Sequence, residues 1–257
     1  MKIAFFDVDG TLLPMGRRQI SEKTIRALNG LRRSGVLLCM ATGRSYPAAP
    51  RFPGVEFDLL MTFNGAYVTA GNEVLFKNPF GEADKRRILQ NLAEMGRAAA
   101  VSNEHFIRTN GTDADLEQYF AFGNEKLVIA EDFAACCDKE LYQIMCACRK
   151  EEYERILEGT QDAQITAWWD RAADIIPRSA GKGNAVRAVL ARYGWKKEEA
   201  IAFGDGQNDI GMLEAVGTGV AMGNAKDEVK ASADAVCPPA EEDGIYAYCL
   251  ENRLIAE

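Results

Sequence analysis

The residues best suited to chemistry lie at the start of the chain, where Asp7 and Asp9 stand one residue apart. They follow an apolar run over residues 3–6, which reads as a strand buried in a parallel sheet. Gly10 lets the backbone turn, so that both carboxylates and nearby N–H groups can face one small volume. Carboxylates and open backbone amides suit a Mg²⁺ ion that carries a phosphate group. A plain Asp-Gly turn is the alternative, and the remainder of the chain argues against it.

A second acidic loop lies far along the chain, over residues 204–209, with two acids, an amide and two glycines. It follows the apolar run 200–203 and precedes a helical pattern, and such a strand-to-helix turn is a favoured site for a metal or a phosphate. Lys182 stands between Gly181 and Gly183 at the start of another helical pattern, where it supplies a cation beside free N–H groups. Alone this lysine is a weak signal, because most Gly-Lys-Gly stretches are surface loops.

The composition narrows the reaction that these groups can perform. With His105 as the single histidine, mechanisms that pair Ser or Cys with His and a His-rich zinc site are poorly supported. A carboxylate that attacks phosphorus to form an aspartyl-phosphate is then the natural covalent route. The neighbouring carboxylate can protonate the leaving alkoxide and later take a proton from water. Mg²⁺ would neutralise the charge of the phosphate that repels a nucleophile.

The elements that must position these groups are apolar strands that end on polar residues. Residues 3–6 end on Asp7 and Asp9, residues 36–41 on Thr42, and residues 201–203 on Asp205. In a parallel sheet these strand ends lie along one edge, which is where open α/β folds bind ligands. The sequence therefore predicts one site built at that edge.

The alternation of strands and helices is interrupted in the middle of the chain. A helix that Ser21 caps, and further helices over 182–193, 210–216, 226–233 and 246–252, alternate with strands, as in a βαβ core. Between them the pattern predicts helices near 84–95 and 151–157 and strands near 99–102, 106–108, 141–148 and 165–169. The fold prediction is α/β: a Rossmann-like parallel-sheet core over residues 1–80 and 178–257, with an inserted α+β cap domain over residues 81–177.

Bulk properties exclude several classes of partner. The chain has 257 residues, 47% hydrophobic and 26% charged, with a net charge of −8. That charge argues against a nucleic-acid surface, which needs to neutralise phosphates, and no stretch has the length of a membrane span. Seven cysteines without metal-type spacing favour buried, reduced thiols and a cytoplasmic protein. We expect a phosphorylated small molecule as partner, and neither nucleic acid nor membrane.

Four ordered motifs resemble those of the haloacid dehalogenase (HAD) superfamily, most closely its Cof-like phosphatases with a large cap between the second and third motifs. They are Asp7-Val8-Asp9-Gly10-Thr11, Thr42-Gly43-Arg44, Gly181-Lys182-Gly183 and Gly204-Asp205-Gly206-Gln207-Asn208-Asp209. The stretches 220–225 and 242–245 also look like that subgroup. One departure follows Arg44, where prolines at 47, 50 and 53 interrupt the usual helix. We expect a short helical turn and then a loop there.

The resemblance implies a role for each motif residue. Asp7 would be the nucleophile and a Mg²⁺ ligand; Asp9 would be the general acid and base, with its carbonyl on the metal. Asp205 would be the third protein ligand, and Asp209 would steady the metal site without binding the metal itself. The transferring phosphoryl group would be bound by Thr42, Gly43, Arg44, Lys182 and Asn208. Asn64 also lies beside this site in the expected fold and is a candidate substrate contact.

The expected activity is a Mg²⁺-dependent phosphatase that hydrolyses phosphate monoesters of small metabolites through an aspartyl-phosphate on Asp7. Sugar phosphates, nucleotides and phosphorylated cofactors all remain open as substrates. A sugar phosphomutase of the same superfamily is an alternative, and it would yield isomer in place of free phosphate. A non-catalytic metabolite-binding protein is the alternative from another class, and it would bind ligand without turnover.

Overall fold

The computed structural model describes residues 1–123, 125–167 and 169–256. The chain divides into two compact units. The first comprises Met1–Gly43, Pro50–Phe76 and Gly181–Glu257, and the second comprises Arg44–Ala49 and Lys77–Ala180. Trp168, within the strand expected near 165–169, lies outside the described residues. No helix among the described residues has both the length and the apolar character needed to cross a bilayer.

The first unit is built on one sheet with the strand order β13-β12-β11-β1-β2-β3-β4-β5. Neighbouring strands from β13 to β3 pair in parallel, and β4 turns back antiparallel to β3. The strands are β1 (Ile3–Phe6), β2 (Leu37–Ala41), β3 (Leu59–Thr62), β4 (Tyr67–Ala70), β5 (Glu73–Lys77), β11 (Ala200–Gly204), β12 (Thr218–Ala221) and β13 (Ala235–Val236).

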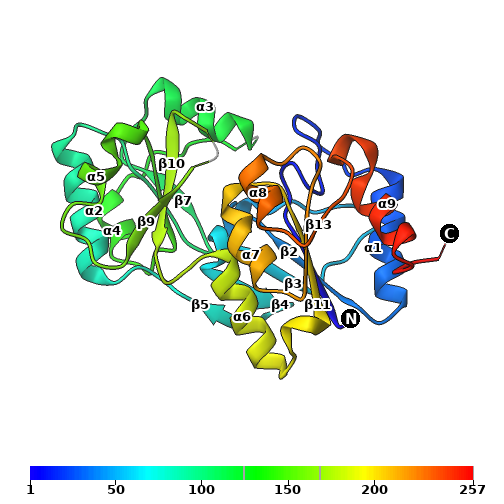
Figure 1. Cartoon of the computed structure of the whole chain (residues 1–257). Helices are drawn as coiled ribbons and strands as arrows, with labels where there is room; N and C mark the ends of the chain where they lie inside the picture. The colour runs from blue at the N-terminus through cyan, green and yellow to red at the C-terminus, as the bar shows by residue number, and fades with distance from the viewer. Residues whose placement is uncertain (124, 168, 257) are drawn as a thin grey trace. The chain divides into compact units, whose positions relative to one another are not determined.

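The core of this unit lies on both faces of the sheet, because β1 sends alternate side chains to opposite sides. Ala4 and Phe6 pack with α1 and α9, whereas Ile3 and Phe5 pack with α6, α7 and α8. Figure 1 shows α1 and α9 on one side of these strands and α6 and α7 on the other. The helices are α1 (Glu22–Arg33), α6 (Lys182–Tyr193), α7 (Ile210–Glu214), α8 (Asp227–Ala231) and α9 (Gly244–Glu251).

Local signals in the sequence set the ends of these helices. The Ser21 side chain accepts a hydrogen bond from the backbone N–H of Thr24 at 3.0 Å, which caps α1 as predicted. Gly194 ends α6 in the left-handed conformation (φ 68°), which an L side chain rarely adopts. The start of α6 at Lys182 matters most for function, since it fixes where that side chain enters the core.

The topology reverses between β1 and β11. From β1 the chain adds β2 and β3 on one side, and later it adds β11, β12 and β13 on the other. Such a switch point leaves a crevice at the carboxyl ends of the two central strands, where open α/β sheets bind ligands. Asp7 follows β1 and Asp205 follows β11, so the two carboxylates flank the switch point.

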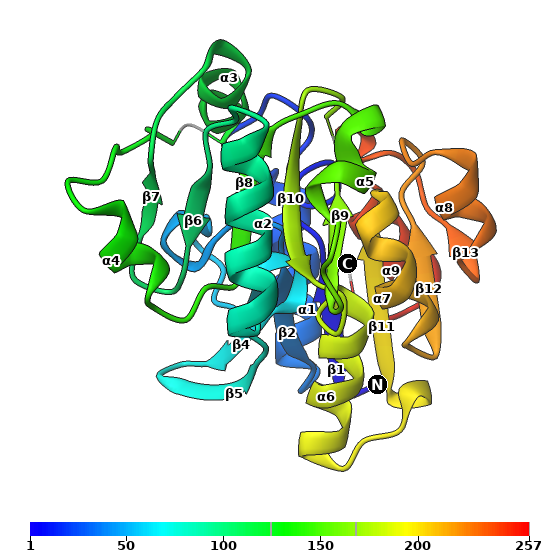
Figure 2. The same ribbon diagram turned by 90° about the vertical axis from the view of Figure 1, so that its left-hand side faces the viewer.

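The second unit is an antiparallel sheet with the order β7-β6-β8-β10-β9 and helices on both faces. Helices α2, α4 and α5 pack on one face, and α3 packs on the other. Figure 2 shows α2 in front of this sheet, running in nearly the same direction as its strands. The elements are α2 (Glu82–Glu94), β6 (Ala100–Ser102), β7 (Ile107–Thr109), α3 (Ala114–Phe122), α4 (Phe133–Cys137), β8 (Gln143–Ala147), α5 (Tyr153–Ile156), β9 (Ala163–Thr166) and β10 (Ala172–Pro177).

Three elements of the second unit were not predicted: α3, α4 and β10. α3 lies in a polar stretch without clear periodicity, and only Leu116 and Phe120 of this helix are buried. β10 is buried along its whole length between β8 and β9, yet Asp174 interrupts its apolar run. The predicted turn after Arg44 is present as a short 3₁₀ helix, Tyr46–Ala48, within the segment that groups with the second unit.

Candidate active site

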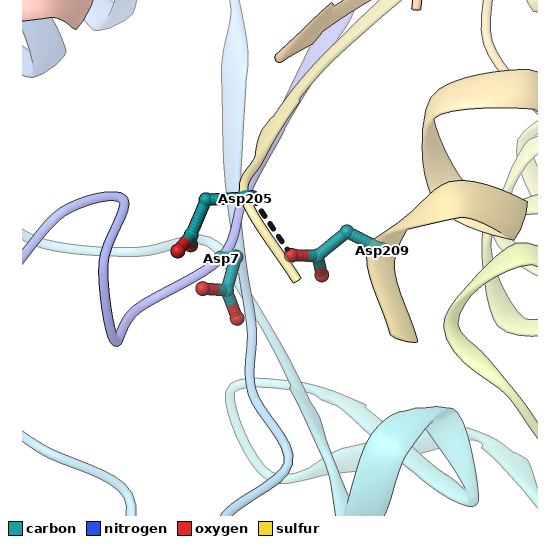
Figure 3. A group of neighbouring side chains, drawn as sticks. All are labelled: Asp7, Asp205 and Asp209. Carbon is teal, nitrogen blue, oxygen red and sulfur yellow. Dashed lines mark hydrogen bonds between the residues drawn. The ribbon is translucent and has the colours of Figure 1, made fainter. Parts of the chain in front are cut away.

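Three carboxylates meet at the switch point of the first unit. Asp7, Asp205 and Asp209 each offer an oxygen, and these oxygens lie within 4.8 Å of one another. Figure 3 shows the three side chains converging from the end of β1 and from the loop after β11. Asp9 lies in the same turn as Asp7 but is exposed to solvent. The buried and the exposed carboxylate therefore differ in environment, as different chemical roles would require.

Both carboxylate oxygens of Asp209 accept hydrogen bonds from other groups of the protein. Its Oδ2 accepts hydrogen bonds from the backbone N–H groups of Asp205 (3.0 Å) and Gly206 (2.9 Å). Its Oδ1 accepts from Nζ of Lys182 at 2.6 Å. The Asp209 side chain is completely buried. Asp209 thus holds the backbone of the acidic loop in shape around Asp205 and Gly206.

Lys182 enters the site from the first residue of α6 and is 1% exposed. Its Nζ donates to Oδ1 of Asp7 at 2.5 Å as well as to Asp209. Burial alone would lower the pKa of Lys182, but the charges of Asp209 and Asp7 raise it above the ordinary value, so the ammonium form is stable. Burial and then the charge of Asp209 raise the pKa of Asp7, while Lys182 opposes that shift.

Asp205 is oriented by partners from two other segments. Oγ1 of Thr11 donates to its Oδ1 at 2.8 Å, and Nδ2 of Asn224 lies 3.2 Å from its Oδ2. Nδ2 of Asn224 also donates to the carbonyl of Gly10 at 2.9 Å. Gly10 has φ +94°, and a Cβ there would collide with the Asp205 carboxylate. Burial, and next the charge of Asp209, raise the pKa of Asp205 to about 6.

The loops after β2 and β3 complete the site on its other side. Thr42 is buried, and its carbonyl accepts a hydrogen bond from the backbone N–H of Asn64 at 3.1 Å. The Asn64 side chain accepts from Nδ2 of Asn208 at 2.9 Å. Gly43 packs closely enough on Asn64 that a Cβ on Gly43 would lie 3.0 Å from Oδ1 of Asn64. These contacts bring Thr42, Gly43 and Asn208 to the edge of the sheet where Asp7 lies.

The structure brings most of the predicted site residues together within the first unit. The exception is Arg44, which begins the segment that groups with the second unit. Sequence reasoning assigned no role to Thr11 or Asn224. The signal for Asn224 was available, since it lies three residues after the end of β12, as Asp9 lies three residues after the end of β1, and the rule about polar residues at strand ends applies equally to it.

The chemistry of this cluster fits a hard divalent cation. Mg²⁺ prefers a few carboxylate oxygens and keeps several waters, and Asp7 and Asp205 supply such oxygens. Burial first, and then the negative charge of Asp209, raise the pKa of both carboxyls, and Lys182 only partly offsets the repulsion between these charges. A cation bound there would relieve that repulsion. Asp209 is less suited to be a ligand, because its oxygens already accept three hydrogen bonds.

Comparisons with known proteins agree with this geometry. The family model of the haloacid dehalogenase-like hydrolases matches residues 4–248. A Bacillus subtilis (strain 168) protein named "Putative phosphatase YkrA" is 33% identical over 98% of this chain and 97% of its own length. The pyridoxal phosphate phosphatase YbhA of Escherichia coli (strain K12) is 32% identical over 98% of this chain and 99% of its own.

Solved structures show the same relationship. The HAD subclass IIB sugar phosphatase BT4131 superimposes with a TM-score of 0.89 and 30% identity, over 99% of this chain and all of its own. The chain therefore belongs to the haloacid dehalogenase-like hydrolases, and within them to the enzymes that hydrolyse phosphoric monoesters.

Proposed function

We propose that this protein is a Mg²⁺-dependent phosphatase of small phosphorylated metabolites that works through an aspartyl-phosphate on Asp7. One observation carries the proposal: the buried ammonium of Lys182 contacts Asp7 beside Asp205, at the switch point of a parallel sheet. This reaction requires a nucleophilic carboxylate, a cation that binds the phosphoryl oxygens and a second carboxylate that binds a metal. They converge at one edge of the sheet.

In the first step, an oxygen of Asp7 attacks phosphorus and the bond from phosphorus to the ester oxygen breaks. The leaving alkoxide takes a proton from Asp9, whose exposed position suits exchange with solvent and substrate. Thr42, the Gly43 N–H, Lys182 and Asn208 would hold the phosphoryl oxygens. Arg44 would add a further contact to the substrate.

In the second step, Asp9 takes a proton from a water molecule whose oxygen attacks phosphorus. The bond from phosphorus to Asp7 breaks, inorganic phosphate leaves, and both aspartates return to their starting states. Asp7, Asp205 and the carbonyl of Asp9 would hold Mg²⁺, which supplies neutralisation of the phosphate charge. Asp209 would keep the loop of Asp205 in place.

We propose a sugar phosphate or a phosphorylated cofactor as substrate. The relatives support this choice, because one is named for pyridoxal phosphate and another for a sugar phosphate. We also propose that the enzyme acts in the cytoplasm. All seven cysteines are free thiols, five of them buried and Cys136 and Cys137 half-buried, which suits a reducing compartment.

The test is release of inorganic phosphate from p-nitrophenyl phosphate, a hexose phosphate, a nucleoside monophosphate and pyridoxal 5′-phosphate, with Mg²⁺ or with EDTA. We expect turnover in the presence of Mg²⁺ and none with EDTA, and we expect Asp7→Asn to abolish the turnover. The exposed Asp227 makes the same chemical change available as a control, so Asp227→Asn should retain activity. Formation of an isomer in place of free phosphate would identify a mutase, and ligand binding without turnover would identify a binding protein.

A second experiment tests the covalent route. p-Nitrophenolate leaves without a proton, so Asp9→Asn should still be phosphorylated by p-nitrophenyl phosphate while its hydrolysis is slow. Mass spectrometry of the quenched Asp9→Asn protein should show one added phosphoryl group, located on the peptide that contains Asp7. Absence of the adduct during continued turnover would contradict the aspartyl-phosphate.

A further inference from the structure

The chain is left-handed at three consecutive residues immediately after β3. Phe63, Asn64 and Gly65 have φ values of 52°, 54° and 94°. A left-handed conformation costs roughly 1–2 kcal/mol for an ordinary L residue, and a bulky residue such as phenylalanine is seldom found there. Phe63 is nevertheless fully buried. Strain of this kind persists where the surroundings impose it, and it is common at functional sites.

Asn64 connects two of the loops that would bind phosphate. Its backbone N–H donates to the carbonyl of Thr42 at 3.1 Å, and its side-chain oxygen accepts from Nδ2 of Asn208 at 2.9 Å. Asn64 makes both contacts from the left-handed turn. The Asn64 side chain is 2% exposed, so a polar group has been buried to make them.

The same turn packs against the segment that carries Lys182. A Cβ on Gly65 would lie 2.6 Å from the carbonyl oxygen of Gly181 and 2.9 Å from the backbone nitrogen of Lys182. Only glycine fits at that distance and at that φ. The turn over residues 63–65 therefore touches all three segments that carry proposed phosphate ligands in the first unit: Thr42–Gly43, Lys182 and Asn208.

We infer that Asn64 is a positioning residue that orients the Asn208 amide toward the phosphoryl group, an inference that rests on the proposed function. An amide nitrogen carries two N–H donors. Because Asn64 accepts one of them, the plane of the Asn208 amide is fixed and its second N–H has a set direction. In this inference the function of the strained turn is to place the Asn64 side-chain oxygen within hydrogen-bond distance of Nδ2 of Asn208.

The test measures the affinity for inorganic phosphate, by calorimetry and by competitive inhibition, in Asn64→Gly, Asn208→Ala and the double variant. Glycine accepts the left-handed backbone, so Asn64→Gly removes the side chain without adding strain. We expect it to weaken phosphate binding about threefold to tenfold, the effect of one hydrogen bond, and to raise KM for the ester. In the Asn208→Ala background the same change should have less than about a twofold effect, because its partner is gone.

Arg253 provides the matched control. It is an exposed residue with φ 55°, so Arg253→Gly makes the same backbone substitution away from the phosphate loops and should leave phosphate affinity unchanged. If Asn64→Gly does not fold, Asn64→Asp keeps an acceptor oxygen and a residue that tolerates left-handed backbone. Removal of Asn208 should then cost as much affinity in the Asn64→Asp background as in the wild type.

Unchanged phosphate affinity in folded Asn64→Gly would overturn the inference, as would an equal loss with and without Asn208. Either result leaves the proposed function intact if the wild type hydrolyses esters. Failure of the wild type to hydrolyse any ester would instead count against the proposed function.

Discussion

Nζ of Lys182 lies 2.6 Å from Oδ1 of Asp209, and both side chains are buried. The two residues come from the start of α6 and from the loop after β11, so the ion pair joins segments that meet only in the folded core. Lys182 also contacts Asp7. One buried cation is thus shared by the proposed nucleophile and by the residue that shapes the acidic loop over residues 204–209.

Asp209→Asn should destabilise the protein and reduce its activity. Removing one partner of a buried ion pair costs about 3–5 kcal/mol, and we expect about 3 kcal/mol, because Lys182 keeps its contact with Asp7. Urea denaturation in EDTA should show a lower midpoint with an unchanged slope. Asp227→Asn, an exposed control, should keep the wild-type midpoint. A midpoint for Asp209→Asn within error of the wild type would show that the ion pair adds no stability.

Thr11→Val should weaken Mg²⁺ binding while the fold is retained. Valine has nearly the shape of threonine but cannot donate to Oδ1 of Asp205, which then loses the 2.8 Å hydrogen bond that orients it. Loss of such a partner typically lowers metal affinity about tenfold or more. Calorimetric titration with Mg²⁺ measures the effect, and equal affinities for Thr11→Val and wild type would contradict this role.

Mg²⁺ binding should weaken as the pH falls through the range near the pKa of Asp205. Burial and the charge of Asp209 raise that pKa to about 6. Above this value the carboxylate is ionised and can bind a cation, and below it a proton competes, with affinity falling up to about tenfold per pH unit. Because the hydrogen bond from Thr11 lowers the pKa of Asp205, Thr11→Val should shift the transition to higher pH. Mg²⁺ affinity that stays constant from pH 7.5 to pH 5 would contradict the assignment of Asp205 as a ligand.

Gly10→Ala should abolish Mg²⁺ binding, and Gly35→Ala should not. Both glycines are left-handed, at φ +94° and +80°, so an alanine at either site costs roughly 1–2 kcal/mol of strain. A Cβ at Gly10 would also strike the Asp205 carboxylate, whereas a Cβ at Gly35 meets nothing within 4 Å. Comparing thermal unfolding with Mg²⁺ titration separates the two effects. Wild-type Mg²⁺ affinity in Gly10→Ala would mean that Asp205 can move aside without loss.

The sequence by itself determined the class of fold and predicted that Asp7, Asp205 and Asp209, which the structure brings together, lie at one edge of the sheet. Apolar runs that end on Asp7, Thr42 and Asp205 predict parallel strands with their polar ends at one edge, since a buried strand must be apolar and its end need not be. Helix signals were equally local. The Ser21 side chain caps α1 through the N–H of Thr24, three residues away, and Gly194 ends α6 through its own left-handed backbone, so no tertiary contact was needed to find either signal.

Only the tertiary structure decided which groups touch, because the partners are distant in sequence. β10 was not predicted as a strand, because Asp174 interrupts its apolar run. Tyr119 of α3 donates a hydrogen bond to the Asp174 carboxylate at 2.5 Å, which allows the acid to be buried there. Asn64 shows the same limit. Its backbone N–H meets the carbonyl of Thr42 and its side chain meets Asn208, and because both partners are distant in the sequence, no local rule predicts these contacts.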